Sequence, residues 1–276
     1  IKLGNFEDDF EKIRNSDWII EAVVERLDIK KNIFEKVEKY RKTGSIVSSN
    51  TSSIPISQLS EGRSDVFKKH FCGTHFFNPP RYLRLLEIIP TPETEPDLID
   101  FFMHFGEINL GKQTVLCKDT PAFIANRIGV MSGVKVFDLT QKYDLSIEEV
   151  DTLTGSLIGR PNTGTYRLQD LVGLDTGDKV TQFVVNNVKN DSFFESVGKE
   201  PEIKFMTFLL KNKFLGNKTG KGFYEKTNKK DQKGKTIINA LDLKTLEYKP
   251  SVLVKNSILK EAKAIEKMQK RISFLL

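Results

Sequence analysis

The sequence predicts an α/β domain with a doubly wound parallel sheet, followed by an all-α domain. Short apolar runs alternate with segments of helical periodicity as far as Lys118. This alternation is typical of β–α–β units with right-handed crossovers. After Lys118, helical periodicity alone continues as far as residue 225. We therefore expect domains at residues 1–118 and 119–225, and a third segment at 226–276 that begins a further region.

In the first domain, each element follows from the spacing of its apolar residues. Residues 1–14 predict a loop or short strand that leads into a helix start. Residues 17–25 form an almost continuous apolar run, as expected of a strand buried on both faces. Residues 27–42 repeat apolar side chains at helical spacing and stop at Thr43-Gly44. The other elements predicted are a strand at 45–49, a helix at 56–61, strands at 66–77 and 83–89, a helix at 95–105 and a strand at 113–118.

The second domain begins with helix-start chemistry. Thr120-Pro121 offers a hydroxyl cap and a proline in the first turn of a helix at 123–142. Ser146, three residues before Glu149, predicts a capping box. Further helices are expected at 168–172, 175–188 and 201–212, then a basic linker at 226–236, a small hairpin at 236–248 and an amphipathic helix at 251–276.

Composition excludes several classes of function. Forty-three basic and 37 acidic side chains give a net charge of +6. They are interspersed, so a phosphate-bearing small molecule is a better expectation than nucleic acid. The two cysteines, Cys72 and Cys117, lie in apolar runs and predict buried thiols in a reducing compartment. No apolar run approaches the ~20 residues of a membrane span. The three histidines lack cysteines at zinc-finger spacing, so we expect no metal.

Residues 73–89, GTHFFNPPRYLRLLEII, carry the best candidates for catalysis. His75 and Glu87 each lie in an apolar run, and Asn78-Pro79-Pro80 between them interrupts regular structure. Two strands that return side by side would bring imidazole and carboxylate together. Such a histidine is a general base near neutral pH. Spacing alone also allows a core histidine and an unrelated strand glutamate.

The wording of this segment resembles the 3-hydroxyacyl-CoA dehydrogenase family. Four other segments extend the resemblance in the family's order: SSNTSSI at 48–54, CKDTPAFIANRIG at 117–129, GLD at 173–175 and KTGKGFY at 218–224. IGRP at 158–161 and TLEYKP at 245–250 are similar to the dehydrogenase part of bacterial multifunctional fatty-acid oxidation proteins. The resemblance implies a truncated Rossmann-like sheet plus a helical C-terminal domain.

The resemblance also implies an activity and a set of residues. The activity is NAD-dependent oxidation of (S)-3-hydroxyacyl-CoA to 3-oxoacyl-CoA in fatty-acid β-oxidation, by a cytoplasmic homodimer that pairs through its helical domain. His75 matches the family's general base and Glu87 its orienting carboxylate. Ser52 and Asn126 match positions that hold the substrate near the histidine. The positions that match cofactor contacts are Glu25, Lys30, Ser52, Asn78 and Lys218.

One departure from the family pattern is large. No G-x-G-x-x-G motif occurs in the 276 residues, although such glycines let a backbone approach the dinucleotide pyrophosphate. We expect the chain to start after that unit and, taken alone, to bind NAD poorly and to be inactive. The alternative is a non-catalytic acyl-CoA-binding or structural remnant, which the sequence upstream of Ile1 would distinguish. A hydroxyisobutyrate-type dehydrogenase fits less well, because that class uses a lysine base.

Overall fold

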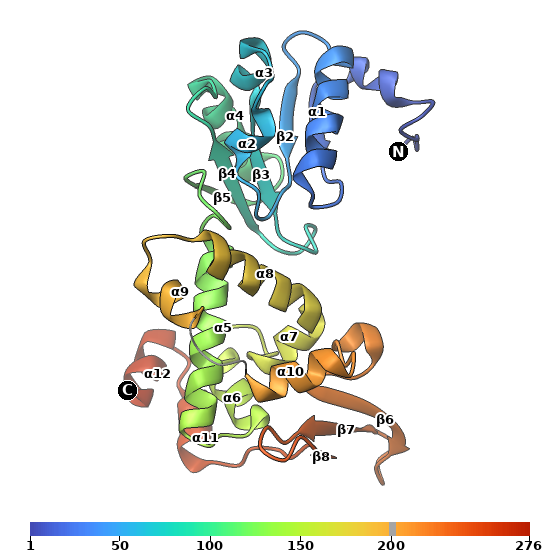
Figure 1. Ribbon diagram of the computed structural model, residues 1–276. Helices are drawn as coiled ribbons and strands as arrows, with labels where there is room; N and C mark the ends of the chain where they lie inside the picture. Colours follow the sequence, from blue (N-terminus) through green and yellow to red (C-terminus); the bar gives the residue numbers. More distant parts are fainter. Residues whose placement is uncertain (199–202) are drawn as a thin grey trace. The chain divides into compact units, whose positions relative to one another are not determined.

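The computed structural model describes residues 1–198 and 203–276, and these form two compact units, Ile1–Ile128 and Gly129–Leu276 (Figure 1). The first unit is an α/β sheet domain and the second is largely helical. The boundary between the units lies within helix α5 (Ala125–Lys142), whose first turn belongs to the first unit. Within the described residues, no helix combines the length and the apolar character that crossing a membrane requires.

The first unit is built on one five-stranded sheet. Its order is β1-β2-β3-β4-β5. The β1, β2 and β3 strands run parallel, β4 is antiparallel to β3, and β5 runs parallel to β4. The Rossmann-like α/β fold class is confirmed. The strands are Trp18–Glu21, Ile46–Ser49, Phe71–Phe76, Leu85–Pro90 and Gln113–Leu116.

Helices pack on both faces of this sheet. Phe71 and Cys72 are neighbours on β3 and belong to two different core clusters, because side chains alternate between the faces of a strand. Phe71 packs with Phe34 and Phe67, whose ring centroids lie 5.0 and 5.2 Å away. The helices of this unit are η1 (Phe10–Asn15), α1 (Leu27–Tyr40), α2 (Ile56–Ser60), α3 (Asp65–Lys69) and α4 (Pro96–Ile108).

Two strand predictions in this unit were too long. The run at 66–77 is a helix, α3, before it becomes the strand β3. Ser64 caps that helix by accepting a hydrogen bond from the Phe67 amide at 3.2 Å. This bond satisfies one of the backbone N–H groups that the first turn of a helix leaves unpaired. The run at 17–25 is a strand only as far as Glu21.

The second unit surrounds an aromatic core. Phe137 and Tyr166 stack with centroids 5.3 Å apart, and Phe205 and Phe223 pack around them. The expected capping box is confirmed, since Ser146 and Glu149 make both of its hydrogen bonds. The elements that follow α5 are α6 (Ile147–Leu153), η2 (Ser156–Ile158), α7 (Tyr166–Val172), α8 (Leu174–Asn187), α9 (Ser192–Val197), α10 (Lys204–Lys211), η3 (Asn217–Thr219), β6 (Tyr224–Lys230), β7 (Thr236–Leu241), β8 (Tyr248–Pro250), α11 (Ser257–Ala264) and α12 (Met268–Leu275).

Several predictions in this unit were wrong in detail. The segment 226–236 is not a linker, because β6 pairs antiparallel with β7 to extend the expected hairpin to three strands. The single helix expected at 251–276 is two, separated at Ile265–Lys267. The helix α9 was not predicted. The start of the helix expected at 201–212 lies outside the described residues, and α10 occupies Lys204–Lys211.

Candidate active site

The sheet brings His75 and Glu87 face to face. They are paired residues of the antiparallel strands β3 and β4, and the His75 Nδ1 atom lies 2.7 Å from Glu87 Oε2. Both side chains are buried, with relative exposures of 5% and 1%. The turn after Asn78 reverses the chain so that the two strands meet in this register, as the sequence predicted.

The other oxygen of Glu87 accepts hydrogen bonds from backbone amides at the start of a helix. Its Oε1 atom accepts hydrogen bonds from the backbone amides of Ile124 and Ala125 at 3.1 and 2.8 Å, where α5 begins and a carboxylate is favoured. Burial raises the pKa of Glu87, but the hydrogen bonds from His75 and from these amides outweigh burial and leave the pKa below its ordinary value. Glu87 is therefore ionised at neutral pH.

An ionised Glu87 fixes the histidine tautomer. A carboxylate only accepts hydrogen bonds, so His75 must donate from Nδ1 and keep its lone pair on Nε2. Within the described residues, the structure gives Nε2 no hydrogen-bond partner. In its neutral form, the imidazole of this pair therefore has a free nitrogen that can accept a proton.

A strained turn places the α5 amides and an aromatic wall beside His75. Ala122 and Phe123 both have positive φ angles, 62° and 50°, a conformation that costs non-glycine residues free energy. The predicted start at Thr120-Pro121 was wrong for this reason, and α5 begins at Ala125. The Phe123 and Phe77 rings lie 5.7 and 4.4 Å from the imidazole centroid, so they limit the directions in which it can tilt.

The structure brings Ser52 and Asn126 together. Asn126 Nδ2 donates to the Ser52 carbonyl oxygen at 3.3 Å, so the turn after β2 and the first turn of α5 are joined. The Ser52 amide is held separately by Glu25. Among the described residues, the Ser52 hydroxyl makes no hydrogen bond, and it is available to a ligand.

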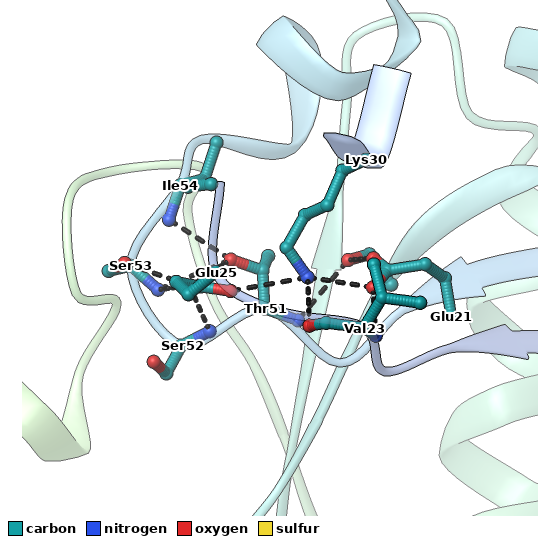
Figure 2. A network of polar contacts seen from close by, with 9 residues as sticks. Glu21, Val23, Glu25, Lys30, Thr51, Ser52, Ser53 and Ile54 are labelled. Atoms are coloured by element: carbon teal, nitrogen blue, oxygen red, sulfur yellow. Dashed lines mark hydrogen bonds and ion pairs between the residues drawn. The ribbon is translucent and has the colours of Figure 1, made fainter. Parts of the chain in front are cut away.

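Glu25 and Lys30 belong to one polar network at the carboxyl ends of β1 and β2 (Figure 2). The Lys30 side chain is 1% exposed and its ammonium lies 2.7 Å from Glu21 and 3.2 Å from Glu25. Burial raises the pKa of Glu25, but the hydrogen bond from Thr51 and the charge of Lys30 lower it below its ordinary value. In this structure Lys30 is committed to protein acceptors, whereas Glu25 is half-exposed.

Among the described residues, neither Asn78 nor Lys218 forms a hydrogen bond or ion pair with this network. Asn78 is an exposed residue in the turn after β3, joined to Pro79 by a cis peptide bond. Lys218 belongs to the second unit, where its ammonium forms an ion pair with the Asp175 carboxylate. A contact between either residue and a cofactor stays a prediction.

Two residues near the site were missed from the sequence. Cys117 lies beside Glu87, and burial together with that carboxylate raises the pKa of its thiol to about 12. Glu21 is the buried partner of Lys30. The sequence signal for Glu21 was a carboxylate inside the apolar run at 17–25, which indicates a buried charge that needs a partner.

Comparison with known proteins identifies the family. Residues 1–120 match the "3-hydroxyacyl-CoA dehydrogenase, NAD binding domain" and residues 123–226 match the "3-hydroxyacyl-CoA dehydrogenase, C-terminal domain". A Bacillus subtilis protein named "Probable 3-hydroxyacyl-CoA dehydrogenase" is 48% identical over 276 residues, which are 100% of this chain and 34% of that protein. The human mitochondrial hydroxyacyl-coenzyme A dehydrogenase is 35% identical over 213 residues, covering 77% of this chain and 65% of that protein.

A solved structure agrees with both domain matches. The crystal structure of (S)-3-hydroxybutyryl-CoA dehydrogenase from Ralstonia eutropha has a TM-score of 0.67 and 28% identity, and covers 77% of this chain and 71% of that chain. This chain therefore spans about a third of the length of the Bacillus subtilis relative and about two-thirds of the human one. From both domain matches and these relatives, the chain belongs to the 3-hydroxyacyl-CoA dehydrogenase family.

Proposed function

We propose that the protein oxidises (S)-3-hydroxyacyl-CoA to 3-oxoacyl-CoA with NAD, as a cytoplasmic homodimeric enzyme of fatty-acid β-oxidation. The observation that carries this proposal is the 2.7 Å contact between His75 and Glu87, with Glu87 held at the start of α5. The family's named activity and the NAD-binding domain match support it.

In this mechanism His75 Nε2 removes the proton of the C3 hydroxyl while the hydride leaves C3. Bound NAD supplies the hydride acceptor. Glu87 keeps the proton on Nδ1 and stabilises the imidazolium that forms, which is the role of the carboxylate in a hydrolytic triad. Ser52 offers its hydroxyl to the substrate, and Asn126 fixes Ser52 through its carbonyl.

The residues on the cofactor side fit only part of a dinucleotide. Glu25 lies beside the turn of Ser52, and Asn78 is exposed in the turn after β3. With Lys30 and Lys218 they are our candidates for NAD contacts. No G-x-G-x-x-G motif occurs in the sequence to cradle the pyrophosphate. The second candidate function is an acyl-CoA-binding segment without turnover.

Two measurements on the 276-residue chain separate these candidates. The first is acetoacetyl-CoA-dependent oxidation of NADH, followed by absorbance, and the second is calorimetric titration with NADH and with acetoacetyl-CoA. Turnover together with binding of both ligands supports the dehydrogenase. Acetoacetyl-CoA binding without NADH binding or turnover supports the second candidate, and failure to bind either ligand contradicts both.

A further inference from the structure

Glu21 is a buried carboxylate with no part in the proposed reaction. It is the last residue of β1 and is 3% exposed. Its Oε1 atom accepts from the Val23 amide at 2.6 Å and from Lys30 Nζ at 2.7 Å, and its Oε2 atom accepts from Ser49 Oγ at 2.6 Å. A buried carboxylate is costly even when paired, and an apolar residue often serves stability equally well. Packing alone therefore does not explain a carboxylate at position 21.

Lys30 carries the connection from Glu21 onward. Its ammonium has three donors, and the structure gives it three acceptors: Glu21 at 2.7 Å, the Val23 carbonyl at 3.2 Å and Glu25 at 3.2 Å. Figure 2 shows the Lys30 chain reaching from α1 to a point between the two carboxylates. Because every donor is used and the side chain is 1% exposed, this ammonium has little freedom to move.

Glu25 passes the constraint to the turn at residues 51–53. Its Oε2 atom faces Lys30, while its Oε1 atom accepts from Thr51 Oγ1 at 2.5 Å, the Ser52 amide at 3.0 Å, the Ser53 amide at 3.1 Å and Ser53 Oγ at 2.8 Å. One carboxylate oxygen thus gathers four donors from three consecutive residues (Figure 2). The backbone at Ser52 is set by the place where Glu25 is held.

We propose that Glu21 is a positioning residue for the candidate active site, and that it acts through Lys30 and Glu25 to fix the backbone that presents Ser52. The relay runs Glu21, Lys30, Glu25, Ser52, and each contact in it is a hydrogen bond or ion pair of 3.2 Å or less. Its functional meaning rests on the proposed function, since that function gives Ser52 its role.

The test is amide hydrogen exchange at Ser52 and Ser53 in the 276-residue chain, resolved residue by residue by NMR. Glu21→Gln keeps the shape of the side chain and an oxygen for Val23 and Lys30, but removes the charge that anchors Lys30. Bonds to charged groups are roughly twice as strong as neutral ones, so exchange at both amides should become about tenfold faster. Exchange at Thr74, in the buried strand β3, reports global unfolding and corrects for any loss of stability.

A matched control lies on the same helix. Glu38, on α1, accepts from the Ser64 amide at 2.8 Å and from Ser64 Oγ at 2.6 Å, so it also pins a serine turn. Glu38→Gln should speed exchange at Ser64 and leave Ser52 and Ser53 unchanged. If it speeds them as much as Glu21→Gln does, the effect is general and the relay is wrong.

The double variant Glu21→Gln/Lys30→Gln separates a relay from a structural role. If Glu21 acts through Lys30, the exchange rates at Ser52 and Ser53 in the double variant should lie within about twofold of those in Lys30→Gln alone. The reason is that the effects of substitutions at contacting sites do not add. Additive effects, or unchanged exchange in a folded Glu21→Gln variant, would overturn the proposal. If Glu21→Gln does not fold, the comparison of the double variant with Lys30→Gln still tests the relay, because both proteins lack the Lys30 ammonium. These measurements need no ligand and no turnover, so they can fail while the dehydrogenase assay succeeds, and the reverse.

Discussion

Replacing Glu87 with glutamine should reverse the tautomer of His75. The carboxylate accepts on both sides: from His75 Nδ1 at 2.7 Å, and from the Ile124 and Ala125 amides at 3.1 and 2.8 Å. A carboxamide has one oxygen and one NH₂ group, so it cannot accept on both sides. The two backbone amides require the oxygen. The NH₂ group must then face His75, whose Nδ1 becomes the acceptor and whose Nε2 carries the proton.

A proton on Nε2 removes the lone pair that the reaction uses. General-base catalysis contributes about 10²–10⁴-fold, and the matching change in a Ser–His–Asp triad lowers kcat about 10⁴-fold. We expect Glu87→Gln to lower kcat about 10³-fold, with KM changed less than about threefold, because Glu87 orients His75 and has no role in binding substrate. The lost charge-assisted bonds should also lower the free energy of unfolding by about 2 kcal/mol.

Two assays test this prediction, and only one of them needs turnover. Nitrogen-15 NMR of the His75 ring identifies the protonated nitrogen directly, and steady-state acetoacetyl-CoA reduction gives kcat and KM. Glu93→Gln, at an exposed glutamate of the same unit, is the control and should change neither. A Glu87→Gln protein whose ring still carries its proton on Nδ1, or whose kcat matches the parent, would refute the reasoning.

Other predictions concern the second unit. Burial raises the pKa of Asp170 to about 6 from its ordinary value of 3.8, although hydrogen bonds from the Phe223 and Tyr224 amides act to lower it. The folded state therefore binds this proton more tightly than the unfolded chain does. Its contribution to the free energy of unfolding is therefore present below about pH 4 and should decline by about 3 kcal/mol as pH rises through 6; denaturation of Asp170→Asn should lack this slope, and equal slopes would contradict it. Ser146→Ala removes the cap of α6 and should cost about 1 kcal/mol in urea unfolding; an unchanged midpoint would count against the cap. A Cβ at Gly222 would lie 2.0 Å from Asp170 Oδ1, whereas one at Gly220 meets nothing within 4 Å. Gly222→Ala should thus cost more than about 3 kcal/mol and Gly220→Ala, at positive φ, about 1 kcal/mol, and similar melting temperatures would argue against the difference.

The sequence predicted most of what determines the chemistry of the first unit. Proline at 79 and 80 broke the apolar pattern between His75 and Glu87, which indicated two strands that return side by side. The β3–β4 register confirms that pairing, although spacing alone also allowed a core histidine and an unrelated strand glutamate. The sequence did not reveal how Glu87 is held. The amides of Ile124 and Ala125 reach it through positive φ angles at Ala122 and Phe123, and nothing in the identities of those two residues favours such angles.

Other misses share one physical cause, tertiary pairing that local patterns do not encode. The strand β6 is rich in lysine and looked like a linker, yet backbone hydrogen bonds to β7 make it a strand whatever its side chains. Glu21 lay inside the apolar run at 17–25 and was given no role. Its partner is Lys30, nine residues later on the next helix, and only the fold brings the two side chains together.

In the proposed reaction, His75 acts as the base of a 3-hydroxyacyl-CoA dehydrogenase. The measurement that tests it most directly is the rate of NADH formation from (S)-3-hydroxybutyryl-CoA by the parent chain, by His75→Gln and by His104→Gln, an exposed histidine on α4. We expect a loss of about 10³-fold or more in His75→Gln and no loss in His104→Gln. Measurable turnover by the parent chain with an equal rate in His75→Gln would contradict it.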